Sequence, residues 1–206
     1  MESKVLLFDF DGTIADTLEA GIRIYNEIAR QSNLTQISKE NLPTLRNNSA
    51  IDNIRYLRVP MTRLPFIARQ VRAAMRRDVP NLKAISGIQQ PLLALKEKGY
   101  LMYVVSSNSK ENIHHFLQLN QIDIFDDIYS VPGLFGKDAK IRRLVDSHGW
   151  DRSRVVYIGD EVRDMRAAKK AGVMPVAVAW GYNTKEALAR ELPMLILQDP
   201  AELSSL

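Results

Sequence analysis

The sequence predicts an α/β protein, with a doubly wound parallel sheet and a smaller, all-helical insertion. Beyond Gly87, short apolar runs of strand length alternate with segments of helical length. This alternation is typical of parallel strands joined by right-handed helical crossovers. Between residues 16 and 86, by contrast, only helical patterns occur. The predicted α/β core therefore comprises residues 1–15 and 87–206, and the predicted cap over one end of the sheet comprises residues 16–86.

The first strand is the apolar run from Val5 to Phe8, with a charged residue on each side. A buried parallel strand has this continuous apolar pattern because both of its faces are covered. A helix follows, with Asp16 or Thr17 as its N-cap. Further cap helices are predicted at 47–56 and 62–77, and no strand is predicted between residues 16 and 86. Four prolines punctuate this stretch: Pro43, Pro60, Pro65 and Pro80.

The second half of the chain supplies the remaining strands and helices of the core. Strands are predicted at 100–105, 128–131, 154–160, 174–181 and 194–197. Helices are predicted at 88–99, 109–119, 138–148, 161–172 and 184–191. Each helix lies between two strands, as a doubly wound sheet requires.

The composition fits a globular protein, with 46% apolar and 25% charged residues. The chain has no cysteine, which excludes disulfides, thiolate metal sites and a cysteine nucleophile and suits a reducing compartment. No apolar segment reaches the length of a signal-peptide core or a membrane span. We therefore expect a soluble, cytoplasmic protein with no membrane partner.

Positive charge is concentrated in the predicted cap. The stretch from residue 46 to 77 has one acid, Asp52, and a net charge of +7 within a chain of +4. It is either a solvated helical face or a positive surface that attracts an anionic ligand. Nucleic acid is not expected, because few aromatic side chains are available there for stacking on bases. The arginines of this stretch are Arg46, Arg55, Arg58, Arg63, Arg69, Arg72, Arg76 and Arg77.

Polar side chains follow the strands that should lie at the centre of the sheet. Asp9 and Asp11 follow the first strand, the segment 106–108 follows the second, and Asp160 follows the strand at 154–158. Lys137 precedes a helix that should begin at the same edge. In open parallel sheets, ligands bind at the carboxyl ends of the strands. We therefore expect these side chains to form one site.

Several carboxylates at one site repel one another, and Lys137 relieves this repulsion only in part. A divalent cation with oxygen ligands, Mg²⁺, would neutralise the remainder. A metal ion, a lysine and a hydroxyl together suit the binding of a phosphoryl group. One carboxylate can attack phosphorus, and a second can protonate the leaving oxygen if its surroundings raise its pKa.

Four segments resemble, in order and spacing, the motifs of the haloacid dehalogenase-like hydrolase superfamily: "DFDGTIADT", "VVSSNS", "FGKDAKIRRL" and "YIGDEVRD". The segment "AWGYNTKEAL" is similar to the one after the last core strand in phosphoglycolate phosphatase-like members. The resemblance spans nearly the whole chain. It implies a Rossmann-like core with a helical cap inserted after the first motif.

The resemblance also implies roles for individual residues. Asp9 would be the nucleophile, and Asp11 the general acid and base. Ser106 would hydrogen-bond the phosphoryl group, and Lys137 would stabilise the charged Asp9 and its phosphorylated form. Asp160 would ligate Mg²⁺.

Asp164 completes the "GDxxxD" pattern and would support the metal or its waters. The implied metal site therefore consists of Asp9, Asp11 through its backbone carbonyl, Asp160 and Asp164. Glu161 stands where phosphoglycolate phosphatases commonly carry a small hydroxyl residue, and its role stays open.

Substrate contacts are predicted for Gly12 and Thr13, for Ser107 and Asn108, and for Arg46 in the cap. The register of the serines is uncertain by one residue, and we favour Ser106 as the phosphoryl ligand because it directly ends the apolar run. Lys140, one helical turn on, is the alternative to Lys137. The alternative for Arg46 is a solvated arginine.

These predictions lead to an Mg²⁺-dependent phosphatase that hydrolyses a small phosphorylated metabolite through an aspartyl-phosphate. Phosphoglycolate is the first candidate substrate. One alternative is a phosphomutase of the β-phosphoglucomutase type, which keeps all four motifs. Another is a non-catalytic protein whose basic cap docks an acidic partner. A haloalkanoate dehalogenase is disfavoured, because that reaction has no use for a leaving-group acid at Asp11.

Overall fold

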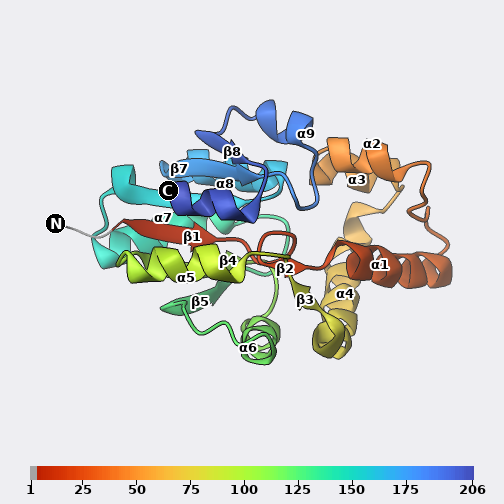
Figure 1. Cartoon of the computed structure of the whole chain (residues 1–206). Coiled ribbons are helices and arrows are strands. Elements are labelled where there is room, and N and C mark those ends of the chain that lie inside the picture. Colours follow the sequence, from red (N-terminus) through yellow and green to blue (C-terminus); the bar gives the residue numbers. More distant parts are fainter. Residues whose placement is uncertain (1–3) are drawn as a thin grey trace.

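The computed structural model describes residues 4–206 and contains the predicted parallel sheet (Figure 1). Its strands lie in the order β5-β4-β1-β6-β7-β8, and every neighbouring pair is parallel. The first strand along the chain, β1, is therefore central, and the strand order reverses beside it. Such a switch point is where doubly wound sheets bind ligands. The bounds are β1 Val5–Phe8, β4 Leu101–Ser106, β5 Asp127–Ser130, β6 Val155–Gly159, β7 Met174–Val178 and β8 Leu195–Leu197.

Helices cover both faces of the sheet, because successive side chains of β1 point to opposite sides. Leu6 and Phe8 pack in the apolar cluster that contains α5 and α6 residues, whereas Val5 and Leu7 pack against α7 and α8. This confirms the doubly wound core. The core helices are α5 Gln89–Glu97, α6 Lys110–Leu119, α7 Lys137–His148, α8 Val162–Ala171 and α9 Lys185–Ala189.

The helical insertion lies beyond the carboxyl end of β1 (Figure 1). Helix α1 packs against α4, and α2 contacts α9 of the core. Helix α1 turns Ile24 and Ile28 inward, at the spacing of one apolar face. The bounds of the cap helices are α1 Leu18–Ser32, α2 Leu42–Asn47, α3 Ala50–Tyr56 and α4 Leu64–Asp78.

Two short strands correct the prediction that residues 16–86 contain none. Strand β2, Ala15–Asp16, pairs antiparallel with β3, Lys83–Ala84, and joins the two chain segments that lead into and out of the insertion. Strands of two residues are too short to show an alternating pattern, so this pairing was invisible in the sequence. The exact division into core and cap, at 15/16 and 86/87, stays a prediction. The first three residues of the predicted core, 1–3, lie outside the described part of the chain.

The helix predicted at 47–56 begins later, and a separate short helix that was not predicted precedes it. Helix α2 ends at Asn47 and α3 begins at Ala50. Ser49 is the N-cap of α3, and its Oγ accepts a hydrogen bond from the backbone N–H of Asp52. Serine is among the preferred N-cap residues, and a cap of this kind separates two helices that an apolar period alone would join.

None of the helices in residues 4–206 combines the length and the apolar character that crossing a bilayer requires. The cytoplasmic location stays a prediction.

Candidate active site

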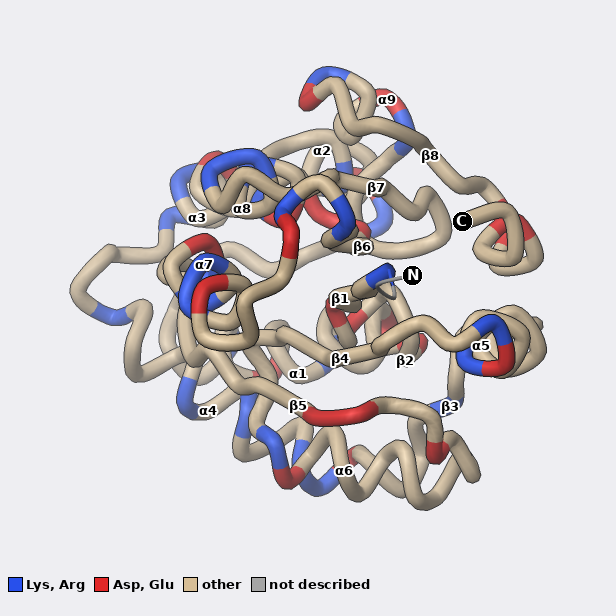
Figure 2. The backbone as a smooth tube through the Cα atoms, turned by 90° about the vertical axis from the view of Figure 1, so that its left-hand side faces the viewer, with Lys and Arg blue, Asp and Glu red and all other residues tan. Residues whose placement is uncertain are grey.

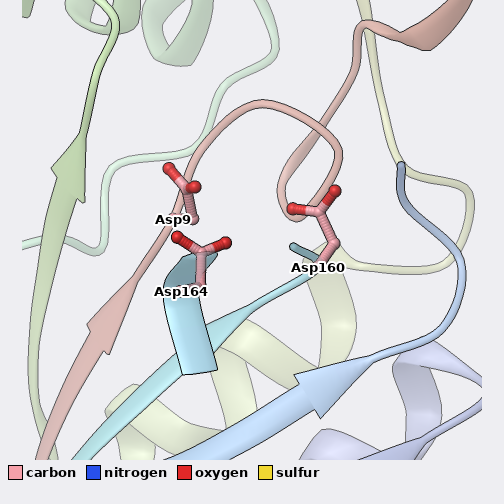
Figure 3. Close-up of side chains that lie close together, drawn as sticks. All are labelled: Asp9, Asp160 and Asp164. Atoms are coloured by element: carbon pink, nitrogen blue, oxygen red, sulfur yellow. The ribbon is translucent and has the colours of Figure 1, made fainter. Parts of the chain in front are cut away.

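Three buried carboxylates lie together at the switch point of the sheet (Figure 3). Asp9 follows β1, Asp160 follows the neighbouring strand β6, and Asp164 lies in the first turn of α8. One carboxylate oxygen of each lies within 4.8 Å of the others. The pairing of β1 with β6 brings Asp9 to the other two acids, although more than a hundred residues separate it from them along the chain.

One ammonium group contacts two of these acids. Lys137 begins α7, and its Nζ lies 2.7 Å from Oδ2 of Asp9 and 2.6 Å from Oδ1 of Asp164. The alternative lysine, Lys140, instead lies over the ring of Tyr129. Lys137 is therefore the lysine that contacts the acidic cluster.

The charges around the cluster divide its acids into two kinds. Burial alone would raise the pKa of Asp9, but Lys137 and then Arg163 lower it below its ordinary value. Burial raises the pKa of Asp164 to about 7, against the opposing effect of Lys137. Burial, and then the charges of Glu161 and Asp164, raise the pKa of Asp160 well above its ordinary range. Burial and the neighbouring acids thus disfavour the ionised form of Asp160 and Asp164.

Asp160 is held in place on both oxygens. Thr13 Oγ1 donates to its Oδ1, and the backbone N–H of Tyr182 donates to its Oδ2, each at 2.7 Å. The chain passes so close that a Cβ at Gly12 or Gly181 would collide with the Asp160 carboxylate, and Gly12 also has a φ of +76°. Both positions therefore need glycine. Thr13, predicted to contact substrate, directs its hydroxyl to Asp160.

Asp11 differs from the three clustered acids. Its carboxylate accepts from the side-chain amide of Asn108, at 3.2 Å to each oxygen, and it lines a cavity. Burial, and then the nearby charge of Asp9, raise its pKa to about 7. A carboxyl with this pKa can give and take a proton near neutral pH. The Asp11 carboxylate is not part of the acidic cluster.

The two serines after β4 have different surroundings. Ser106 is buried, and its Oγ accepts from the backbone N–H of Asn108 at 3.2 Å. Ser107 lines the same cavity as Asp11 and Asn108. Of the two serines, Ser107 is therefore the one in the cavity wall, one position after the serine that the sequence favoured.

Arg163 was not singled out from the sequence, although it lies between the two aspartates of the "GDxxxD" pattern. Its Nη2 lies 2.6 Å from Oε1 of Glu161, whose role the sequence left open, and 3.5 Å from Oγ of Ser107. Both members of this ion pair line the cavity. The available signal was their spacing, since an acid and a base two residues apart can pair at a helix start.

Arg46 reaches from the cap to the core. Its Nε and Nη2 donate to the backbone carbonyls of Tyr182 and Gly181, at 3.1 and 2.9 Å. Its own carbonyl accepts from Thr184 N and from the side chain of Asn183. Arg46 lines the cavity and also fastens α2 to the segment after β7. Its predicted role in substrate binding stays a prediction.

A cavity of about 810 Å³ lies between the cap and the carboxyl edge of the sheet. Its walls include residues of all four cap helices. Asp11, Ser107, Asn108 and Arg163 lie on its core side. The cavity therefore connects the predicted proton donor with the space beneath the cap.

The chain was compared with known families and structures. The model of the haloacid dehalogenase-like hydrolase family matches residues 6–178. A phosphoglycolate phosphatase of Synechococcus elongatus is 29% identical over 97% of this chain and 95% of that protein. One of Pasteurella multocida is 26% identical over 97% and 96%. The crystal structure of a predicted phosphatase from Clostridium acetobutylicum shares the fold, with a TM-score of 0.83, 20% identity and coverage of 99% and 98%.

The family match covers most of the chain and contains all four motifs. The sheet order, the helical insertion after β1 and the acidic cluster at the switch point are consistent with it. The chain belongs to the haloacid dehalogenase-like hydrolase family.

Proposed function

We propose that this protein is an Mg²⁺-dependent phosphatase that hydrolyses a small phosphomonoester through an aspartyl-phosphate on Asp9. One observation carries this proposal: the Lys137 ammonium lies 2.7 Å from Asp9 and lowers its pKa, whereas Asp11, two residues on, lines the cavity and has a pKa raised to about 7. The first acid is thus an ionised nucleophile, and the second can carry a proton near neutral pH. The names of the relatives support phosphatase activity and make phosphoglycolate the first substrate to test.

In the first half-reaction, a carboxylate oxygen of Asp9 forms a bond to phosphorus as the bond to the ester oxygen breaks. The proton of Asp11 passes to that ester oxygen, so the alcohol leaves neutral. The products are the alcohol, an acyl-phosphate on Asp9 and an ionised Asp11. Lys137 remains beside Asp9 and offsets the negative charge there.

In the second half-reaction, a water oxygen attacks the phosphorus while Asp11 accepts a proton from that water. The bond between phosphorus and Asp9 breaks, which restores the Asp9 carboxylate and yields inorganic phosphate. Asp11 is then protonated again for the next turnover. Ser107 lies in the cavity wall, where its hydroxyl can donate to a phosphoryl oxygen. The sequence assigned this role to Ser106.

The acidic cluster suits the metal ion that the proposal requires. Asp9, Asp160 and Asp164 offer oxygen ligands within 4.8 Å of one another, and a bound cation would favour the ionised form of these buried acids. These residues would hold Mg²⁺ directly or through its waters, and the backbone carbonyl of Asp11 is predicted to contribute. When bound, the ion would neutralise charge on the phosphoryl group.

Hydrolysis of p-nitrophenyl phosphate tests the proposal. We expect turnover with Mg²⁺, none with chelator, and loss of at least about a thousandfold in kcat for Asp9→Asn. Asp123→Asn, at an exposed position outside the site, is the matched control and should retain wild-type turnover. Turnover that persists in Asp9→Asn, or that is unchanged when chelator is added, would contradict the proposed chemistry. No described feature favours the phosphomutase or the binding protein.

A further inference from the structure

The cavity above Asp11 is much larger than glycolate, a two-carbon acid, requires. Its volume of about 810 Å³ lies in the range of roughly 300–1,000 Å³ typical of sites that hold drug-sized molecules. Building on the proposed phosphatase activity, we propose that the leaving group is a bulky, predominantly apolar alcohol. The substrate class is then a phosphomonoester with an extended alkyl or aryl body.

Most of the cavity wall is apolar. Helix α1 contributes Leu18 and Ile22, α3 contributes Ile54, and α4 contributes Leu64 and Val71. All five are partly exposed, so the core of the cap does not use their full surface. Burying this apolar surface against a hydrocarbon leaving group would contribute favourably to the binding free energy, whereas a small hydrated leaving group would contribute little. Each additional methylene buried there should tighten binding roughly threefold to fourfold.

The reacting groups identify which part of the substrate fills the cavity. Asp9 is buried in the acidic cluster and binds the phosphoryl end, whereas Asp11, with its carboxyl on Asn108, forms part of the cavity wall. The ester oxygen that Asp11 protonates therefore lies at the cavity floor. The group attached to that oxygen extends between the cap helices.

Two of the three arginines in the wall already have partners. Arg46 donates to backbone carbonyls and Arg163 pairs with Glu161. Arg72 is the wall cation whose guanidinium has no hydrogen-bond or ion-pair partner among residues 4–206. Its backbone carbonyl accepts from Asn112, whose side chain also donates to Asn108 beside Asp11. Arg72 belongs to α4, so it is a charged position within a cap side of the wall that is otherwise mainly apolar.

Two apolar side chains of the cavity wall are strongly exposed. Met61, before α4, and Phe135, two residues before Lys137, both belong to the wall, yet their exposed fractions are 58% and 65%. One comes from the cap and the other from a core loop that leads into the site. An apolar leaving group that extends to Met61 and Phe135 would cover both side chains, as expected of exposed apolar residues at a ligand-binding site.

Simple alkyl phosphates test the proposal, because ethyl, butyl, hexyl and octyl phosphate have leaving groups of nearly equal basicity. We expect kcat/KM to rise at least tenfold from ethyl to hexyl phosphate, and hexyl phosphate to exceed phosphoglycolate. A flat series with phosphoglycolate as the best substrate would overturn the leaving-group assignment and leave the phosphatase proposal intact. No turnover of any ester, p-nitrophenyl phosphate included, would instead overturn the phosphatase proposal.

A binding measurement separates the two proposals further. Hexylphosphonate and ethylphosphonate cannot be hydrolysed, and they share one head group, so the difference between their calorimetric affinities in Mg²⁺ measures the contribution of the alkyl chain. We expect hexylphosphonate to bind at least tenfold more tightly. Equal affinities would overturn the assignment even if the enzyme is active.

Variants locate the effect in the cavity wall. Ile22→Asn and Ile54→Asn should each lower the ratio of kcat/KM for hexyl over ethyl phosphate at least threefold, whereas Leu93→Asn, exposed on α5, should not change it. Because both kcat/KM values are measured on the same variant protein, their ratio does not depend on how much of that protein is folded. An unchanged ratio in both wall variants would place the alkyl chain elsewhere and contradict the proposal.

Discussion

Two adjacent serines follow β4, and their surroundings predict different consequences of mutation. Ser107→Ala should lower kcat/KM by about 10-fold to 100-fold, because a hydrogen bond to a charged phosphoryl group contributes roughly 1.5–3 kcal/mol. Ser106→Ala should chiefly lower stability, by about 1–3 kcal/mol, since it leaves the N–H of Asn108 without its acceptor. Steady-state kinetics and thermal unfolding of both variants measure this. A stable Ser106→Ala protein without activity would return the role to Ser106.

The raised pKa values of Asp11 and Asp164 predict how stability depends on pH. A carboxyl whose pKa is raised by folding stabilises the native state below its unfolded pKa, near 4. This contribution is lost as pH rises through the folded pKa, here about 7. The metal-free protein should therefore lose several degrees of melting temperature between about pH 5 and pH 8. Scanning calorimetry in chelator measures the loss.

Mg²⁺ should reduce this loss, because the cation takes the place of the protons that the cluster otherwise binds. The increase in melting temperature on adding Mg²⁺ should be larger at pH 8 than at pH 5. Asp160→Asn should weaken the Mg²⁺ response, since it removes one carboxylate of the acidic cluster. An Mg²⁺ response that Asp160→Asn leaves intact would place the metal elsewhere.

At the scale of elements, Asn183 joins the cap to the catalytic edge. Its Nδ2 donates to the carbonyls of Arg46 and Asn48, and its Oδ1 accepts from Val162 N at the start of α8. Asn183→Ala should destabilise the protein by about 1–3 kcal/mol and speed amide exchange in α2. Lys185→Ala, on exposed surface nearby, is the control. Hydrogen exchange in α2 that matches wild type would contradict this link.

The strands that hold the site could be predicted from the sequence, because burial on both faces leaves a continuous apolar run. Their carboxyl ends carry Asp9, Asp160 and the serines, so the site's location followed from the parallel topology. The β2–β3 ribbon and the break between α2 and α3 could not be predicted. The ribbon depends on pairing between distant segments, and the break depends on one capping serine, Ser49.

The contacts around the site were less predictable than its location. Arg163 pairs with Glu161, and Asn183 fastens the cap, but neither lies at the end of an apolar run or in a repeating pattern. Ser106 ends the apolar run, as the sequence suggested, yet burial of that position directs its hydroxyl to the backbone. Sequence periodicity identifies which residues are buried, whereas hydrogen-bond partners depend on segments brought together by folding.

At the scale of the whole molecule, positive charge gathers on the cap. Figure 2 shows basic segments along α3 and α4. Arg69, Arg76 and Arg77 of α4 are exposed. Among the described residues, the arginine of the 46–77 stretch that forms an ion pair is Arg55, with Asp52. A positive surface beside the cavity should raise the local concentration of a phosphomonoester dianion. The sequence left open whether this charge serves a ligand or only solvation.

Salt dependence decides between these two possibilities. If the cap attracts substrate, kcat/KM should fall several-fold between about 20 and 300 mM NaCl while kcat changes little, because screening weakens long-range attraction. Replacing Arg69, Arg76 and Arg77 together with Gln should flatten this dependence. The matched control replaces three exposed core cations with Gln: Lys98, Arg143 and Lys170. Equal slopes for the two triple variants would show that the cap arginines only solvate the surface, since both variants lose the same net charge and differ only in where they lose it.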